Sequence, residues 1–218
     1  MTASPTLLLL RHAHVVGHRG DVAITDEGRE QATRAGAWLG ARAYDIAAVM
    51  YGGTRRTRET ADGIAAGLPH GRGLEAADAF ALRNPDLYLG GDRVSMVSSA
   101  EAFAEQTRAM RPEGVTRVAF FREWMSHPDR IGFWLTHDAP PGDDSRSVAR
   151  RISAFAASLN DVPDWHGRTI VAVTHSPVLR SVGLHLRGVD PGEPPYVTGY
   201  AVTTRQGALD VVEMAPAT

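Results

Sequence analysis

Two uninterrupted apolar runs dominate the hydropathy pattern of the chain. Residues 7–10 are four leucines, and residues 169–174 read Thr-Ile-Val-Ala-Val-Thr. Neither run alternates with polar residues, which is typical of strands buried on both faces of a parallel sheet. The first run ends at Arg11 and His12, and the second ends at His175. Ligands of open α/β sheets bind beside the carboxyl ends of the strands, so we expect both histidines at one ligand-binding edge.

Helical periodicity separates these runs. Apolar residues recur at helical spacing after Thr25, which can cap a helix, and again over residues 148–159 and 179–186. A shorter apolar run at residues 46–50 leads into another helical pattern whose first turn contains Arg56. This alternation predicts an α/β fold, a three-layer α/β/α sandwich with a mostly parallel central sheet.

Two serines stand where later helices are expected to begin. Ser145 precedes one apolar helical face, and Ser176 is followed by Pro177, which is well suited to the first helical turn. We expect each serine to cap its helix. Residues 196–204 and 208–214 then have the pattern of a closing β-hairpin, joined at Gln206 and Gly207.

The periodic pattern breaks down between residues 71 and 141. Segments rich in glycine, proline and aspartate separate clusters of phenylalanine and tryptophan in this region. We interpret residues 71–141 as an inserted cap region that folds over the strand ends. A chain of 218 residues can bury one full core, so we expect a single domain over residues 1–218 with this cap-like insertion.

The composition excludes several kinds of chemistry. The chain has no lysine, so all 23 basic residues are arginine, and it has no cysteine. Schiff-base catalysis, a Walker-type phosphate loop, thiolate catalysis and cysteine-ligated zinc are therefore excluded. A net charge of −2 argues against nucleic-acid or anionic-membrane binding, and the apolar runs are too short for a membrane span. We expect a soluble, cytoplasmic protein, and a homodimer is compatible with the sequence.

Four residues in three separate segments are candidates for chemistry at this edge. Arg11 and His12 end the first strand, Arg56 lies in the first turn of a helix, and His175 precedes another helix start. Arginine pairs well with phosphate oxygens, and helix N-termini favour anions. A neutral histidine offers a nucleophilic nitrogen that needs no metal. The set predicts a site for a tetrahedral dianion, whereas the nearby Arg55 and Arg58 suit a solvated helix face.

Five short motifs follow one another along the chain: residues 11–13 (Arg-His-Ala), 24–32 (Ile-Thr-Asp-Glu-Gly-Arg-Glu-Gln-Ala), 56–61 (Arg-Thr-Arg-Glu-Thr-Ala), 142–145 (Gly-Asp-Asp-Ser) and 173–176 (Val-Thr-His-Ser). In this order they resemble the motifs of the histidine phosphatase superfamily, which has the phosphoglycerate mutase-like fold. That family begins with Arg-His-Gly and has an Arg-Ala-any-Gln-Thr-Ala segment in its arginine-bearing helix. The resemblance covers nearly the whole chain outside the cap.

The resemblance implies roles for the candidate residues. His12 would be the nucleophile that becomes a transient phosphohistidine. Arg11, Arg56 and His175 would hold the phosphoryl oxygens, where preorganised cations stabilise the charge of the transition state. The implied activity is metal-independent hydrolysis of a phosphomonoester, with a small phosphorylated substrate and no cofactor.

The family also uses a carboxylate to protonate the leaving oxygen, and here the sequence departs from the pattern. Where the family commonly has leucine, one residue and then glutamate, this chain has Leu82, Arg83 and Asn84. We take Asp86 as the first candidate for the acid, and further candidates are Glu75, Asp78 and Glu123.

Other departures affect the binding of phosphate. His18 occupies the position of a family asparagine that helps to bind phosphate, and Arg83 is a candidate for an additional phosphate contact. Ala13 and Ser176 replace glycines that allow close backbone approach, and Ser176 is a further candidate for substrate binding.

Three other functions remain open at this stage. A mutase-like phosphotransferase would use the same residues but keep the phosphoryl group on the enzyme for an acceptor. A metal-dependent hydrolase could use His12 and His14 as an alternating ligand pair, although no spaced set of aspartates and histidines completes such a site. A non-catalytic binder of phosphorylated ligands would explain the missing glutamate.

Overall fold

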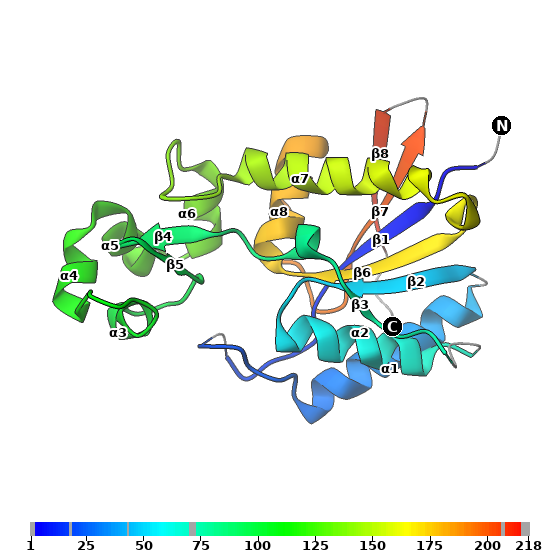
Figure 1. The fold of residues 1–218 in the computed structure, drawn as a ribbon, viewed down its shortest axis with the longest axis horizontal. Helices are drawn as coiled ribbons and strands as arrows, with labels where there is room; N and C mark the ends of the chain where they lie inside the picture. Colours follow the sequence, from blue (N-terminus) through cyan, green and yellow to red (C-terminus); the bar gives the residue numbers. More distant parts are fainter. Residues whose placement is uncertain (1–2, 18, 43, 70–72, 206–207, 215–218) are drawn as a thin grey trace.

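A mixed six-stranded sheet lies at the centre of the computed structural model, which describes residues 3–17, 19–42, 44–69, 73–205 and 208–214. The strand order is β3-β2-β6-β1-β7-β8. The first four run parallel, β7 is antiparallel to β1, and β8 is antiparallel to β7. The expected α/β fold with a mostly parallel sheet is confirmed (Figure 1). The strands are β1 (Thr6–Arg11), β2 (Ile46–Tyr51), β3 (Ala77–Asp78), β6 (Thr169–Thr174), β7 (Gly199–Arg205) and β8 (Ala208–Glu213).

Helices cover both faces of this sheet. α1 (Asp26–Ala41) and α2 (Arg55–Gly67) pack on one face, and α7 (Ser145–Ser158) and α8 (Ser176–Leu186) pack on the other (Figure 1). The leucines of β1 alternate between the layers. Leu8 and Leu10 join the cluster under α1 and α2, and Leu7 and Leu9 join the cluster under α7 and α8. All four are buried, as expected of a strand with a helical layer on each side.

The predicted N-cap of α1 is correct, whereas the predicted N-caps of α7 and α8 are each one residue too late. Thr25 caps α1, where its Oγ1 accepts a hydrogen bond from the Gly28 amide. The N-cap of α7 is Asp144 and that of α8 is His175, one residue before the expected serine in each case. Ser145 Oγ instead donates to the Leu135 carbonyl, so a tertiary contact uses the hydroxyl that was expected to cap.

The closing hairpin also begins later than predicted. β7 starts at Gly199 rather than at residue 196, because Val197 has a φ of 56°. That left-handed conformation is strained for a β-branched residue and cannot continue a strand. Gln206 and Gly207, which were expected at the turn, lie outside the described residues.

Within the segment expected to form the cap, Ala77–Asp78 instead form β3 of the central sheet, where they pair with β2. The rest of the segment lies beside the carboxyl ends of β1, β2 and β6 (Figure 1). It consists of a small hairpin and four short helices that follow a 3-10 turn. These elements are η1 (Phe80–Leu82), β4 (Leu87–Leu89), β5 (Asp92–Val94), α3 (Ala100–Ala104), α4 (Pro112–Arg117), α5 (Ala119–Ser126) and α6 (Arg130–Thr136). Two further 3-10 turns, η2 (Leu159–Asp161) and η3 (Pro163–Trp165), connect α7 to β6.

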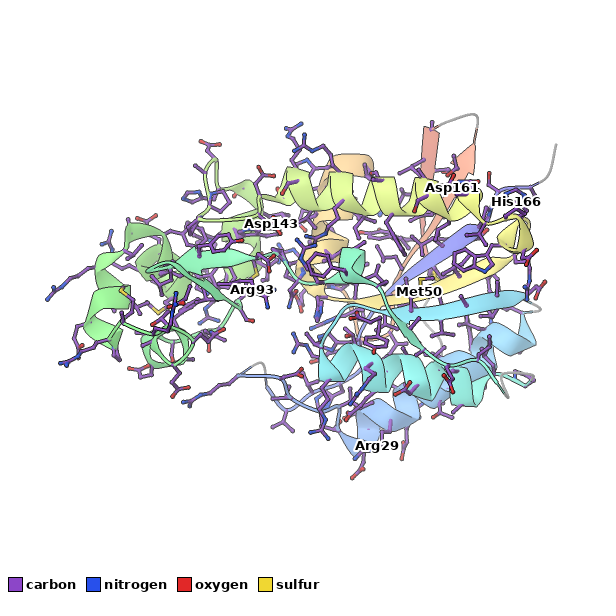
Figure 2. All side chains as sticks on the ribbon, in the orientation of Figure 1. Arg29, Met50, Arg93, Asp143, Asp161 and His166 are labelled. Atoms are coloured by element: carbon purple, nitrogen blue, oxygen red, sulfur yellow. The ribbon has the colours of Figure 1, made fainter. Side chains whose placement is uncertain are left out.

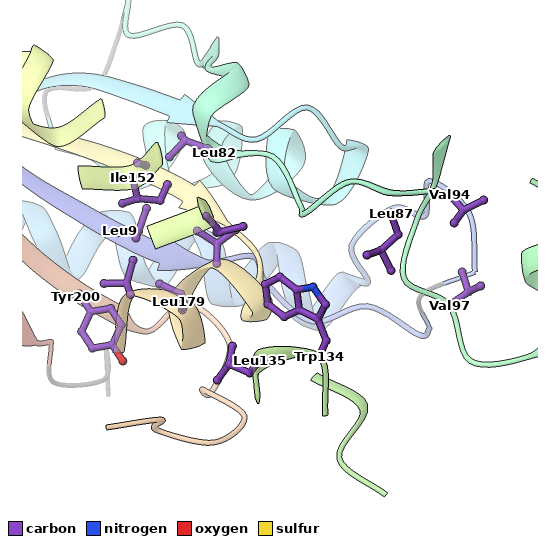
Figure 3. Close-up of a cluster of buried hydrophobic side chains, with 14 of the residues drawn as sticks. Leu9, Leu82, Leu87, Val94, Val97, Trp134, Leu135, Ile152, Leu179 and Tyr200 are labelled. Atoms are coloured by element: carbon purple, nitrogen blue, oxygen red, sulfur yellow. The ribbon is translucent and has the colours of Figure 1, made fainter. Parts of the chain in front are cut away.

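One hydrophobic cluster runs from the sheet into the cap (Figure 3). Leu9, Ile152 and Leu179 lie in its sheet half, and Leu87, Val94 and Trp134 extend it toward the cap hairpin. Trp134 is fully buried, and its indole Nε1 donates to the Asp143 carbonyl at 2.9 Å. The shared core fixes the cap over the strand ends. None of the helices in the described part of the chain has the length and apolar character of a bilayer-spanning segment.

A buried arginine adds a polar connection between the cap and α8. The side chain of Arg180 is 2% exposed, and its two Nη atoms donate to both carboxylate oxygens of Asp129 at 2.7 Å each. Its Nε donates to Asp190 at 2.9 Å. Asp129 is also the N-cap of α6, so this ion pair positions a cap helix that faces the site. Hydrogen bonds from Arg180 lower the pKa of Asp129 to about 2.

We predict that Asp129→Asn lowers the free energy of unfolding by about 1–3 kcal/mol at neutral pH, because Arg180 loses a charged, bidentate partner. The carboxylate of Asp129 has a lowered pKa in the folded state, so its contribution is complete above about pH 4 and is lost as the pH falls toward 2. Urea unfolding of both proteins between pH 7 and pH 3 measures the difference.

The exposed pair of Glu30 and Arg34 provides the control for this measurement. Glu30→Gln should change the free energy of unfolding by less than about 0.5 kcal/mol. An Asp129→Asn effect no larger than that of the control would contradict the assignment.

Candidate active site

The four candidate residues line one cavity of about 880 Å³ between the sheet edge and the cap. His12 follows β1 directly, and its backbone amide donates to the Thr174 carbonyl at the end of β6. The chain leaves the strand at this point, so Arg11 and His12 both reach the cavity although they are adjacent in sequence. Arg56 enters from the first turn of α2, and His175 enters as the N-cap of α8. The structure therefore brings together all three segments that the sequence singled out.

Hydrogen bonds orient the two histidine rings. His12 Nδ1 lies 2.8 Å from the Ala13 carbonyl oxygen, which can only accept, so Nδ1 carries the proton and Nε2 can present a lone pair. His175 Nδ1 lies 3.3 Å from Arg56 Nη2, which can only donate, so the His175 proton lies on Nε2. The ring centroids are 5.6 Å apart. One imidazole thus has the form of a nucleophile, and the other has the form of a hydrogen-bond donor.

Arg11 and Arg56 are buried cations beside each other. Their exposed fractions are 6% and 7%, and burial lowers the pKa of both guanidinium groups. The charge of Arg11 lowers the pKa of Arg56 further, whereas Glu193 partly offsets the effect of burial at Arg11. The Nε atom of each arginine is buried and donates to no acceptor among the described residues. Buried donors without acceptors are costly, and an anion that accepted from both Nε atoms would offset this cost.

The loop after α8 supplies partners of Arg11 that sequence reasoning missed. Glu193 Oε1 lies 2.5 Å from Arg11 Nη2, and Arg11 Nη1 donates to the Pro194 carbonyl at 2.5 Å. The Arg11 guanidinium also lies 4.2 Å from the centre of the Tyr196 ring. Residues 187–198 have no periodic pattern, and the contacts span more than 180 positions, so no local signal predicted them.

The remaining wall of the cavity comes mainly from the cap and from α8, and Gly17 and Arg19 of the loop after β1 also line it. Its apolar part includes Met96, Val97, Trp124 and Ile131, and its polar part includes Ser98, Ser99, Asp129, Arg130 and Arg180. Asn84 reaches the cavity from the segment after η1, which passes close to Gly52. A Cβ at Gly52 would lie 2.2 Å from the Leu82 carbonyl oxygen, so only glycine allows this approach. The Oδ1 of Asn84 is buried and accepts from no donor within the described chain.

The structure places the first candidate acid, Asp86, outside the residues that line the cavity. Its carboxylate pairs with Arg83 at 3.2 Å and with Arg93 at 3.3 Å, and its backbone amide donates to Asp143. Arg93 and Asp143 flank the segment that contains it (Figure 2). Arg83 also stays off the cavity and stacks on Phe80, 4.0 Å from the ring centre. The role expected of Asp86 therefore stays a prediction without direct geometric support.

The other candidates have different positions. Glu75, Asp78 and Glu123 are exposed and do not line the cavity. Ser176 lines it and donates its hydroxyl to Glu193 at 2.6 Å. His18 lies outside the described residues.

His14 does not join His12 as a ligand pair. Its Nδ1 lies 2.8 Å from Thr25 Oγ1, and its ring packs edge-on against Tyr196. Within the described ranges, no three histidine, aspartate or glutamate side chains come together as a metal site requires.

Known proteins share both the motifs and the fold. A family model described as histidine phosphatase superfamily (branch 1) matches residues 7–83. No curated protein sequence matches the chain.

Solved structures match over nearly the full length of the chain. YhfR from Bacillus stearothermophilus is 20% identical with a TM-score of 0.64, covering 99% of this chain and 100% of its own. A phosphoglycerate mutase from Bacillus anthracis is 16% identical with a TM-score of 0.64, covering 99% and 95%. A mycobacterial glucosyl-3-phosphoglycerate phosphatase is 17% identical with a TM-score of 0.63, covering 96% and 98%.

These structures share the fold, and the family model matches the segment that carries Arg11, His12 and Arg56. Residues 7–83 are therefore similar to the histidine phosphatase superfamily (branch 1), and the chain as a whole shares its fold with the solved structures.

Proposed function

We propose that this protein hydrolyses a phosphomonoester through a phosphohistidine on His12, without a metal ion. The observation that carries the proposal is the convergence of His12 with two buried arginines whose Nε atoms have no acceptor among the described residues. A phosphoryl group supplies the oxygens that such donors need, and its phosphorus would face the unprotonated Nε2 of His12.

The reaction then follows in two displacements. Nε2 of His12 attacks phosphorus, the N–P bond forms, and the bond from phosphorus to the leaving oxygen breaks. Negative charge on the three equatorial oxygens is stabilised by Arg11, Arg56 and His175, whose Nε2–H would leave its weak contact with the Gly52 carbonyl oxygen, 3.4 Å away, to reach them. Water next attacks the phosphohistidine, which releases inorganic phosphate and restores the imidazole.

The size and lining of the cavity indicate the class of substrate. A volume of about 880 Å³ exceeds what a phosphate group alone would fill and suits a small metabolite-sized organic part. The apolar cap wall and Arg130 would contact that part. One protein with the same fold is named for dephosphorylating a sugar-containing phosphoglycerate, which supports a small phosphorylated substrate in this chain as well.

We predict that purified protein hydrolyses 4-nitrophenyl phosphate in the presence of excess chelator, because none of the proposed steps uses a metal. His12→Ala should reduce turnover to background. His14→Ala is the matched control, since it removes an imidazole two residues away and should retain most of the activity. Activity that is lost on chelation and restored by zinc, or equal losses in both variants, would favour the metal-dependent alternative.

We also predict competitive inhibition by inorganic phosphate and vanadate. Arg56→Gln should raise the inhibition constant of phosphate about 10- to 100-fold, the effect expected when one charged hydrogen-bonding group is lost. Arg58 is exposed on the same helix, so Arg58→Gln should change the constant less than about twofold. Equal effects of the two substitutions would show that phosphate binds elsewhere.

A further inference from the structure

A strained loop presents a carboxylate to the cavity. Val197, with a φ of 56°, donates its amide to the Arg11 carbonyl at 3.2 Å, and the Arg11 amide donates to the Thr198 carbonyl at 2.9 Å. Strain of this kind persists only where the surroundings hold the backbone in place, and here the end of β1 holds it. The preceding residues of the loop, including Glu193, are thereby fixed against the phosphate-binding edge.

The carboxylate of Glu193 lines the cavity and contacts both Arg11 and Ser176. One oxygen pairs with Arg11 Nη2 at 2.5 Å, and the other accepts from Ser176 Oγ at 2.6 Å. Its side chain is 53% exposed and lines the same cavity as His12. If the phosphoryl group of a substrate binds Arg11, the leaving oxygen would therefore lie near this carboxylate.

Among the described residues that line the cavity, the other carboxylate is Asp129. Both of its oxygens accept from Arg180, and the pKa of about 2 keeps it ionised. Asp86 is paired with two arginines off the cavity, and the amide of Asn84 cannot act as an acid. Glu193 also pairs with an arginine, but its partner is Arg11, the proposed phosphate ligand, so a bound phosphoryl group would compete for that partner at the cavity.

We propose that Glu193 is the general acid that protonates the leaving oxygen, an inference that rests on the proposed phosphatase function. A bound phosphoryl dianion would take the place of Glu193 on Arg11, and the released carboxyl group would then carry the proton that is transferred. As the N–P bond forms and the P–O bond breaks, this proton moves to the leaving oxygen, so the product departs as a neutral alcohol. In the second displacement, the carboxylate accepts a proton from the attacking water and returns to the acid form.

Two substrates of similar shape test the proposal. Phenyl phosphate has a leaving oxygen that needs protonation, whereas the leaving oxygen of 4-nitrophenyl phosphate needs little. Glu193→Gln should lower kcat/KM for phenyl phosphate about 100-fold and for 4-nitrophenyl phosphate less than about fivefold. Glu193→Asp keeps a carboxyl group and should restore part of the lost phenyl phosphate turnover.

Two controls accompany these variants. Glu213 is also a partly exposed glutamate paired with an arginine, but it lies away from the cavity, so Glu213→Gln should leave both rates unchanged. Asp86→Asn should lower the two rates by the same factor or not at all. Thermal unfolding of each variant establishes that it is folded.

The results that overturn the proposal are distinct. Equal losses for both substrates in Glu193→Gln, or tighter phosphate binding with no loss of turnover, would mean that Glu193 only competes for Arg11. A selective loss in Asp86→Asn would move the role to Asp86. If the wild-type protein hydrolysed neither substrate, the proposed function would be wrong. The proposed role of Glu193, which rests on that function, would then be wrong as well.

Discussion

Two arginines buried side by side form the constraint on which the rest of this site depends. Arg11 and Arg56 are each nearly inaccessible, and their charges repel each other where water cannot screen them. Such an arrangement is stable only if anions or acceptors compensate for it. Glu193 and the Pro194 carbonyl compensate Arg11 in part. The remaining buried Nε donors are the basis of the proposal that this edge binds a phosphoryl group.

The frame that holds these cations could be predicted from the sequence. The leucines at residues 7–10 and the run at residues 169–174 form adjacent parallel strands, and their buried character follows from apolar runs without alternation. Thr25 and Arg56 lie where helix-capping and first-turn preferences placed them. In each case the signal is local, since one strand or one helical turn contains all the residues that specify it.

Features that depend on distant segments could not be predicted in the same way. Glu193 meets Arg11 only because β7 pairs antiparallel with β1, which brings the loop before β7 to the end of β1. A similar reason explains why Ser176 does not cap α8. Its hydroxyl donates a hydrogen bond to the distant Glu193 instead. The sequence offered Asp86 because it follows the family-like segment, but ion pairs with Arg83 and Arg93 hold it away from the cavity. Contacts between segments that are far apart in the sequence therefore determine where these side chains lie.

The proposed mechanism requires covalent chemistry at His12, where a protonated Nδ1 would leave Nε2 for attack on phosphorus. Quenching the protein in alkali during turnover of a radiolabelled phosphomonoester, followed by peptide mapping, tests this most directly. We expect an alkali-stable, acid-labile phosphoryl label on the peptide that contains His12 and no label in His12→Ala. A label on His175, or full turnover with no trapped label in the wild-type protein, would contradict it.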